Sequence, residues 1–351
     1  MQRNADRGRT APMSGVADER IVPRGATPDW MRRLIINRRR ELGSAAALII
    51  IFATFAAFNI KFLSVDSLSG ILTVAGELGT IALGEGLLMV SGEFDISVAA
   101  VFTLSSIIMA TLLKASLPEP VALITALFFG LVAGWINGEI TLRTHIPSFI
   151  ATLGTQMFWY GMALLITGGW PLSLLNPPGI LNGLGGATVG TSALHISAVW
   201  WLVSAVVIWI LLEKTRYGNW VYGTGGNASA ARSVGVPVNR VKLMNFMIAG
   251  LMAAFAGTMN LGRMDTATPT PTGLELEAIA AAVVGGVSLW GGVGTVVGML
   301  LGTLALSSIE IGLVSSGAPS YWYQAFVGVV IVVVVVINHT LDSVLAKRVR
   351  R

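Results

Sequence analysis

Long stretches without a charged residue constrain the fold of this chain more than any other feature. Residues 146–212 contain no Asp, Glu, Lys or Arg. Shorter runs of the same kind cover residues 42–60, 96–113, 120–138, 243–262, 278–309 and 311–341. A helix that spans a bilayer needs roughly 20 apolar residues, and charged residues make up only 12% of the chain, against about 25% in soluble domains. We therefore predict an all-α polytopic membrane protein.

The apolar pattern predicts about ten transmembrane helices within a membrane domain at residues 42–338. We place them at 42–60, 69–90, 95–115, 120–139, 147–167, 195–212, 243–261, 276–290, 293–312 and 320–338. Glycine interrupts the stretch "VVGGVSLWGGVGTVVG", and non-helical backbone at membrane depth occurs where protein or water satisfies it. Some of the ten segments are therefore predicted to be broken or re-entrant.

The distribution of the 23 Lys and Arg residues predicts the orientation. Ten lie in residues 1–41, five in 213–243, four in 339–351 and one at Arg143. The other three are Lys61, Lys114 and Arg263. Basic residues favour the cytoplasmic side. We expect two basic cytoplasmic tails, 1–41 and 339–351, with both termini and the 213–243 loop in the cytoplasm.

Signatures of enzymes are scarce in the sequence. There is no cysteine, the three histidines lack the spacing of metal ligands, and no GxxxxGK[ST] motif for a nucleotide phosphate occurs. We expect no catalytic residue, metal site or bound cofactor in this chain, and no nucleic-acid partner.

Carboxylates inside the predicted membrane segments are candidate functional groups, because burying them in lipid is costly. They are Glu77, Glu85, Glu93, Asp95, Glu139 and Glu310. Glu77 and Glu85 lie on one helical face and are expected to pair with polar groups of neighbouring helices. Near Gly92, Asp95 or Ser97 either caps a broken helix or lines a substrate path. Candidates for that path are Glu93, Asp95, Ser97, Asn137 and Ser148.

The loop "GGNASAARSVGVPVNRVK", residues 225–242, predicts a short helix on the cytoplasmic side. Asn227 or Ser229 supplies a cap, three alanines favour the helix, and Gly235 followed by Pro237 ends it. Its basic surface suits either an acidic partner or lipid headgroups.

Four segments together resemble a known family. "SGEFDISVAAVF", "IPSFIATLGTQMFWYGMALLITGG", "TRYGNWVYGTGGNASAARSVGVPVNRVKLMNFMIAGLMAAFAG" and "ELEAIAAAVVGGVSLWGGVGTVVG" occur in this order. They are similar to the signatures of the permease subunits of bacterial ribose- and xylose-type ABC sugar importers. This chain departs from the pattern at Glu93 and Ala99, where relatives have glycine, and at Val293, where many have arginine.

The resemblance implies a permease of the inner membrane that translocates a monosaccharide or related polyol delivered by a periplasmic sugar-binding protein. It also implies a second permease copy or paralogue and two cytoplasmic ATPase subunits, which bind ATP and Mg²⁺ in place of this chain. The ATPase-coupling helix of the family matches Asn227, Ala228, Ser229, Ala230, Ala231, Arg232, Ser233, Val234, Gly235 and Val236.

An alternative is a stand-alone proton-coupled transporter that uses Glu77, Glu85, Glu93 and Glu310 as proton carriers. The uncharged connector Gly168–Gly190, which carries Trp170, is predicted to face the periplasm, where it either docks the binding protein or is an ordinary connector.

Overall fold

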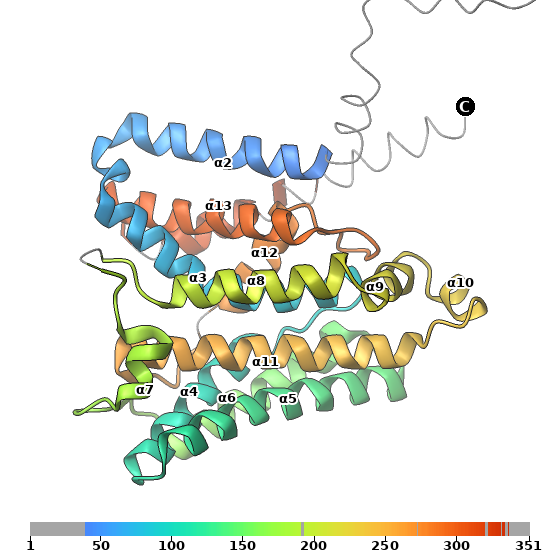
Figure 1. The fold of residues 1–351 in the computed structure, drawn as a ribbon, viewed down its shortest axis with the longest axis horizontal. Helices are drawn as coiled ribbons and strands as arrows, with labels where there is room; N and C mark the ends of the chain where they lie inside the picture. Colours follow the sequence, from blue (N-terminus) through green and yellow to red (C-terminus); the bar gives the residue numbers. More distant parts are fainter. Residues whose placement is uncertain are drawn as a thin grey trace, which may run out of the picture. The chain divides into compact units, whose positions relative to one another are not determined.

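The computed structural model describes residues 39–336, apart from 191–192, 272, 320–321, 331 and 334–335. The predicted basic tails lie outside the described residues, except for Arg39–Glu41. The described part is built from helices (Figure 1). They are α2 (Arg39–Phe58), η1 (Ile60–Leu63), α3 (Val65–Val90), α4 (Val98–Lys114), α5 (Glu119–Thr144), α6 (Ser148–Thr167), α7 (Gly179–Leu181), the π-helical turn η2 (Asn182–Gly186), α8 (Ser197–Glu213), α9 (Arg216–Gly226), α10 (Ala228–Ser233), α11 (Val238–Met264), α12 (Leu274–Val284) and α13 (Val296–Ser315).

Membrane-spanning character is confirmed by helix length and apolarity. Six described helices are long and apolar enough to cross a bilayer, namely α2, α3, α5, α6, α11 and α13. The pair α8 and α9, bent by 74°, would make a seventh, and α4 is a shorter apolar helix. The remaining predicted segments fall on α12 and on the helical residues 322–330. The all-α polytopic fold is therefore confirmed, and the count of ten spans is approximate.

Helix α3 forms the centre of the bundle, whereas α2 lies at its surface. Within the apolar window of α3, 89% of residues are buried, against 6% for α2. Ser44 donates from α2 to the carbonyl of Val284 at 2.8 Å, and Asn59 donates to the carbonyl of Ser315 at 2.7 Å. The first bond joins α2 to the end of α12, and the second joins the residue after α2 to the end of α13, which lies beside α2 in Figure 1.

Glycine allows α5 and α11 to pack with their backbones in contact, side by side in Figure 1. A Cβ atom added at Gly134 would collide with the carbonyl of Phe246, and one at Gly250 with the carbonyl of Gly130. Small residues let membrane helices approach closely. Close packing is therefore the role of these glycines.

Helix breaks were predicted at the glycine clusters, and the structure brings two such breaks together in space. The first separates α3 from α4, and the second separates α12 from α13. The amide of Gly292 donates to the carbonyl of Val90 at 2.8 Å, and Gly92 and Gly225 stand against Gly291. We call this meeting of Gly92, Gly225, Gly291 and Gly292 the glycine junction. Helix α12 ends six residues before the predicted residue 290, because the chain turns at Gly286 with φ of 88°.

A small sheet lies at the end of the bundle opposite the glycine junction. Strand β1 (Leu172–Ser173) pairs antiparallel with β2 (Thr266–Ala267), with Leu172 opposite Ala267. This pairing attaches the connector after α6 to the loop between α11 and α12. The connector contains Trp170, which is exposed.

Candidate functional site

The predicted short helix of the loop is present as α10. The side chain of Asn227, not that of Ser229, caps it by accepting a hydrogen bond from the amide of Ala230 at 3.0 Å. Gly235 ends it with φ of 86°, a conformation that favours glycine. Ala231 is buried, whereas Val234 is 80% exposed. Helix α10 therefore presents an open surface at one end of the bundle (Figure 1), and its role in ATPase coupling stays a prediction.

Glu93 pairs with a basic residue near the start of α11. Its carboxylate forms an ion pair with the ammonium group of Lys242 at 2.5 Å, and both side chains are largely buried. Because Lys242 follows α10 by only nine residues, this pair connects the first helix break to the segment that carries the loop.

The other four candidates for the substrate path lie together beside this pair. The amide of Asn137 donates to Asp95 Oδ2 and to Ser97 Oγ, each at 2.7 Å. The amide of Phe94 approaches Ser148 Oγ at 3.5 Å. All four side chains are buried. The group therefore fixes residues 91–97 against α5 and α6.

Of the two residues predicted to cap the helix after Gly92, only Asp95 bonds a backbone amide at the start of α4. Asp95 Oδ1 accepts the amide of Ser97 at 2.8 Å, which orders the turn before α4, whereas the side chain of Ser97 makes no cap bond. None of the five candidates belongs to the lining of two neighbouring cavities, of about 530 Å³ and 350 Å³, elsewhere in the bundle. Their assignment to a substrate path stays a prediction.

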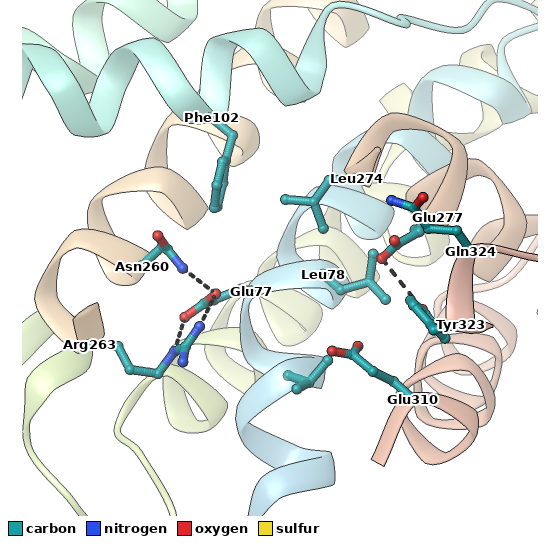
Figure 2. A pocket seen from close by; sticks show the side chains of 11 residues that line it. Glu77, Leu78, Phe102, Asn260, Arg263, Leu274, Glu277, Glu310, Tyr323 and Gln324 are labelled. Carbon is teal, nitrogen blue, oxygen red and sulfur yellow. Dashed lines mark hydrogen bonds and ion pairs between the residues drawn. The ribbon is translucent and has the colours of Figure 1, made fainter. Parts of the chain in front are cut away.

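A polar cavity of about 530 Å³, shown in Figure 2, lies near the end of α11 that is far from α10 in the chain. It is lined by α3, α4, the last turn of α11, the first turn of α12, α13 and the helical segment after residue 321. The lining residues are Val74, Glu77, Leu78, Phe102, Asn260, Arg263, Leu274, Glu277, Glu310, Tyr323 and Gln324. We call it the central cavity.

An ion pair forms one wall of the central cavity. Arg263 donates from Nε to Glu77 Oε1 at 2.6 Å and from Nη2 to Glu77 Oε2 at 3.0 Å, and the amide of Asn260 donates to Oε2 at 2.8 Å. Figure 2 shows Arg263 and Asn260 both reaching Glu77. Such a bidentate contact fixes both side chains in one orientation.

The opposite wall carries further acids. The hydroxyl of Tyr323 donates to Glu277 Oε2 at 3.4 Å, and Glu310 stands nearby in Figure 2. Three carboxylates thus face one guanidinium group in the lining. This arrangement disfavours an anionic ligand and offers several acceptors to a neutral one.

The sequence indicated part of this site. Glu77 and Glu310 stood out as intramembrane acids, and the expected pairing of Glu77 with neighbouring helices is confirmed. Arg263, Glu277 and Tyr323 were missed as site residues. Arg263 directly follows the uncharged run 243–262, and a lone basic residue at that place was the available signal.

Comparison with known proteins identifies relatives across most of the chain. Residues 67–335 match the family described as branched-chain amino acid transport system / permease component. The autoinducer 2 import system permease protein LsrC of Salmonella typhi is 35% identical over 90% of this chain and 90% of its own length. The protein of the same name from Shigella flexneri is 34% identical over 90% and 92%. No solved structure matches this chain.

Proposed function

This chain belongs to the permease-component family of branched-chain amino acid transport systems, and from that premise we propose that it carries a neutral, polyhydroxylated small molecule through the central cavity. Its relatives named above are permease subunits of an autoinducer 2 import system, and the chain is the permease subunit of an importer of the same ABC type.

The observation that carries the proposal is a polar cavity inside an apolar bundle. Binding sites for small molecules combine an apolar wall with a few fixed polar groups. Here Leu78 and Phe102 supply apolar surface, whereas Asn260, Tyr323 and Gln324 supply amides and a hydroxyl. Hydroxyl groups of a ligand both donate and accept, so they match this mixture.

An aliphatic amino acid fits the same cavity less well. Its ammonium group would find acceptors at Glu277 and Glu310, but its carboxylate would meet a single basic group in the described part of the lining, Arg263, which is already bound to Glu77 through two hydrogen bonds. Recognition of a substrate carboxylate would require breaking that pair. The cavity therefore favours the sugar or polyol class over leucine-like substrates.

The partners we propose follow from the family and from the exposed loop. Two cytoplasmic ATPase subunits, with ATP and Mg²⁺ bound to them, dock on Asn227–Val236, and a second permease copy or paralogue completes the membrane part. A periplasmic binding protein delivers the substrate at the end that carries β1 and β2. The excess of Lys and Arg in the tails and the loop supports this orientation, with both termini in the cytoplasm.

Proton-coupled transport by this chain alone is the weaker hypothesis. Two of the four carboxylates it needs, Glu77 and Glu93, are held in ion pairs with Arg263 and Lys242. Each pair would have to break during every cycle of proton exchange.

Reconstitution into liposomes with the ATPase and the binding protein tests the function. We expect ATP-dependent uptake of autoinducer 2 or ribose that requires the binding protein, and no uptake of leucine. Uptake driven by a pH gradient without ATP, or uptake of leucine alone, would contradict the proposal.

A pair of variants tests the central cavity. Arg263→Gln should reduce uptake at least tenfold, because it releases Glu77, while the protein still assembles with its ATPase. Arg143→Gln is the matched control, since Arg143 pairs with Glu139 on an exposed surface, and it should transport at the wild-type rate. Equal uptake by the two variants would exclude the cavity as the path.

A further inference from the structure

A second cavity adjoins the central one. It measures about 350 Å³ and shares Phe102 and Asn260 with it. Its lining residues are Phe102, Thr103, Ser106, Asn260, Met264, Thr266, Thr268 and Thr270. We call it the threonine cleft. Met264, Thr268 and Thr270 are exposed, so the cleft opens at the surface.

The chemistry of the threonine cleft differs from that of the central cavity. Among the described residues no charged side chain belongs to its lining, and five of the eight that line it carry hydroxyl groups. Two of these hydroxyls are already engaged: Ser106 donates to the carbonyl of Thr103 at 2.7 Å, and Thr266 is bonded to Ser173 at 3.0 Å. The latter bond belongs to the β1–β2 pairing, which positions the loop over the cleft.

Thr103 is a buried hydroxyl without a partner. Its side chain is 2% exposed, and its oxygen has no hydrogen bond to any described residue. A threonine inside a helix commonly bonds a carbonyl four residues earlier, as Thr73 and Thr80 do here. A buried hydroxyl without a partner is unfavourable, so a polar group that enters the cleft gains from pairing with it.

Thr103 differs from other buried hydroxyl groups without a partner because it lines a cavity. Thr111, Thr141, Thr224 and Ser307 are also buried without a partner among the described residues, but they line neither the threonine cleft nor the central cavity. Thr103 alone of these five therefore combines an unpaired hydroxyl with one of these two cavities.

We propose that the threonine cleft is a second, outer binding site for the transported molecule, which binds there through neutral hydrogen bonds before it passes Phe102 into the central cavity. This inference rests on the proposed function of the central cavity. Thr103 is the most buried residue of the described lining, and the ligand is a neutral hydroxylated compound, because the described lining offers hydroxyls and an amide but no charge.

The absence of native cysteines gives a direct test. Thr103→Cys and Ser307→Cys each introduce one thiol at a buried hydroxyl position, and a membrane-impermeant methanethiosulfonate reagent is added to the complete complex in liposomes. We expect Thr103→Cys to react at least tenfold faster than Ser307→Cys, with autoinducer 2 slowing the reaction. Equal rates for the two variants would overturn the proposal.

Removal of the hydroxyl tests binding in the cleft. Thr103→Val keeps the shape of the side chain and should lower the initial uptake rate at least fivefold, whereas Thr103→Ser should transport at nearly the wild-type rate. A general packing defect would impair Thr103→Ser as well, and that result would contradict the inference, as would wild-type uptake by Thr103→Val.

Failure of this inference is distinguishable from failure of the proposed function. If Arg263→Gln abolishes ATP-dependent uptake while Thr103→Val transports normally, the cleft is not a binding site and the central cavity still is. If wild-type uptake needs no ATP, the proposed function fails, and the labelling rates of Thr103→Cys and Ser307→Cys still decide whether the cleft is open.

Discussion

The two ends of this bundle are built by different kinds of contact. At the end that carries α10, the glycine junction brings backbone against backbone, with the amide of Gly292 bonded to the carbonyl of Val90. Toward the other end, side chains meet around open space, with Glu77 and Arg263 on the wall of the central cavity. Backbone contacts tolerate no added atom, whereas side chains around a cavity can rearrange.

This contrast fits an alternating-access transporter. Under the proposed function, a force applied to α10 would pass into rigid backbone contacts and reach the interior without being absorbed by loose side chains. The cavities would then be the places where side chains contact the transported molecule. If the comparison is correct, variants of the glycine junction should lose folding or assembly, and variants of the cavities should lose transport while remaining folded.

The largest effect is expected at the glycine junction. A Cβ atom at Gly225 would collide with the carbonyl of Val90 and lie 2.5 Å from the amide of Gly292. Overpacking typically costs about 1–3 kcal/mol and occasionally more, and the cost is expected above this range here, because the neighbours are backbone atoms that cannot rotate away. Gly225→Ala should therefore yield little folded protein, as measured by size-exclusion chromatography in detergent.

Gly226→Ala is the matched control for this prediction. At that position the nearest atom to an added Cβ lies 4.0 Å away, which is ordinary contact distance, so the variant should elute and unfold like the wild type. A folded Gly225→Ala protein of normal stability would mean that the junction is not rigid.

The next largest effect is expected at the buried network around Asp95. Asp95→Ala removes the acceptor of the Ser97 amide and one acceptor of Asn137. Leaving a buried hydrogen-bond donor without its acceptor costs about 1–3 kcal/mol, so we expect a clear drop in the thermal unfolding midpoint of a protein that still folds. A variant that kept its stability but lost uptake would instead support the predicted role of Asp95 in a substrate path.

Glu139→Ala is the control for the network, because Glu139 pairs with an exposed partner, Arg143. Exposed ion pairs contribute about 0–1 kcal/mol. The unfolding midpoint of this variant should stay close to that of the wild type.

Much of the fold could be predicted, because a chain in lipid must form its membrane segments from long uncharged stretches. Runs without charge identify membrane segments directly, and the glycine-rich stretches predicted that some of the helices are broken. The end of α12 was predicted less well, since its last residues remain apolar and only the backbone conformation at Gly286 ends the helix. The apolar character of a segment indicates that it lies in the membrane, but it does not indicate where the helical hydrogen bonds of that segment end.

The candidate site was harder to predict, because its contacts join residues far apart in the sequence. Glu77 and Arg263 are separated by 186 positions, and no periodic pattern relates them. The motif around Asp95 attracted attention because its polar residues are adjacent in sequence. Their closeness in the structure has a local explanation, the turn before α4, whereas a cavity requires several helices to be placed first.

A smaller effect is expected for the ion pair between Glu93 and Lys242. Both side chains are about 16% exposed, so solvent screens the pair in part. Glu93→Lys and Lys242→Glu should each lower stability by about 1–2 kcal/mol and reduce uptake, because each places two like charges together.

The double variant that carries both reversals is the sharper measurement for this pair. It restores opposite charges at the same place, so it should recover most of the stability and uptake lost in the single variants. No recovery would mean that the pair does not connect the first helix break to α11.

The smallest effect on stability, and a large one on assembly, is expected on α10. Arg232 is exposed and donates to Asn239 at 2.9 Å, so Arg232→Glu should change the free energy of unfolding by only about 0.5 kcal/mol. Reversal of a charge at the rim of an interface chiefly changes association, so co-purification of the ATPase and its response to loaded binding protein should fall. Asn239→Ala removes the same hydrogen bond without reversing the charge and should assemble normally. If Arg232→Glu also assembled and transported at the wild-type rate, Asn227–Val236 would not be the coupling helix.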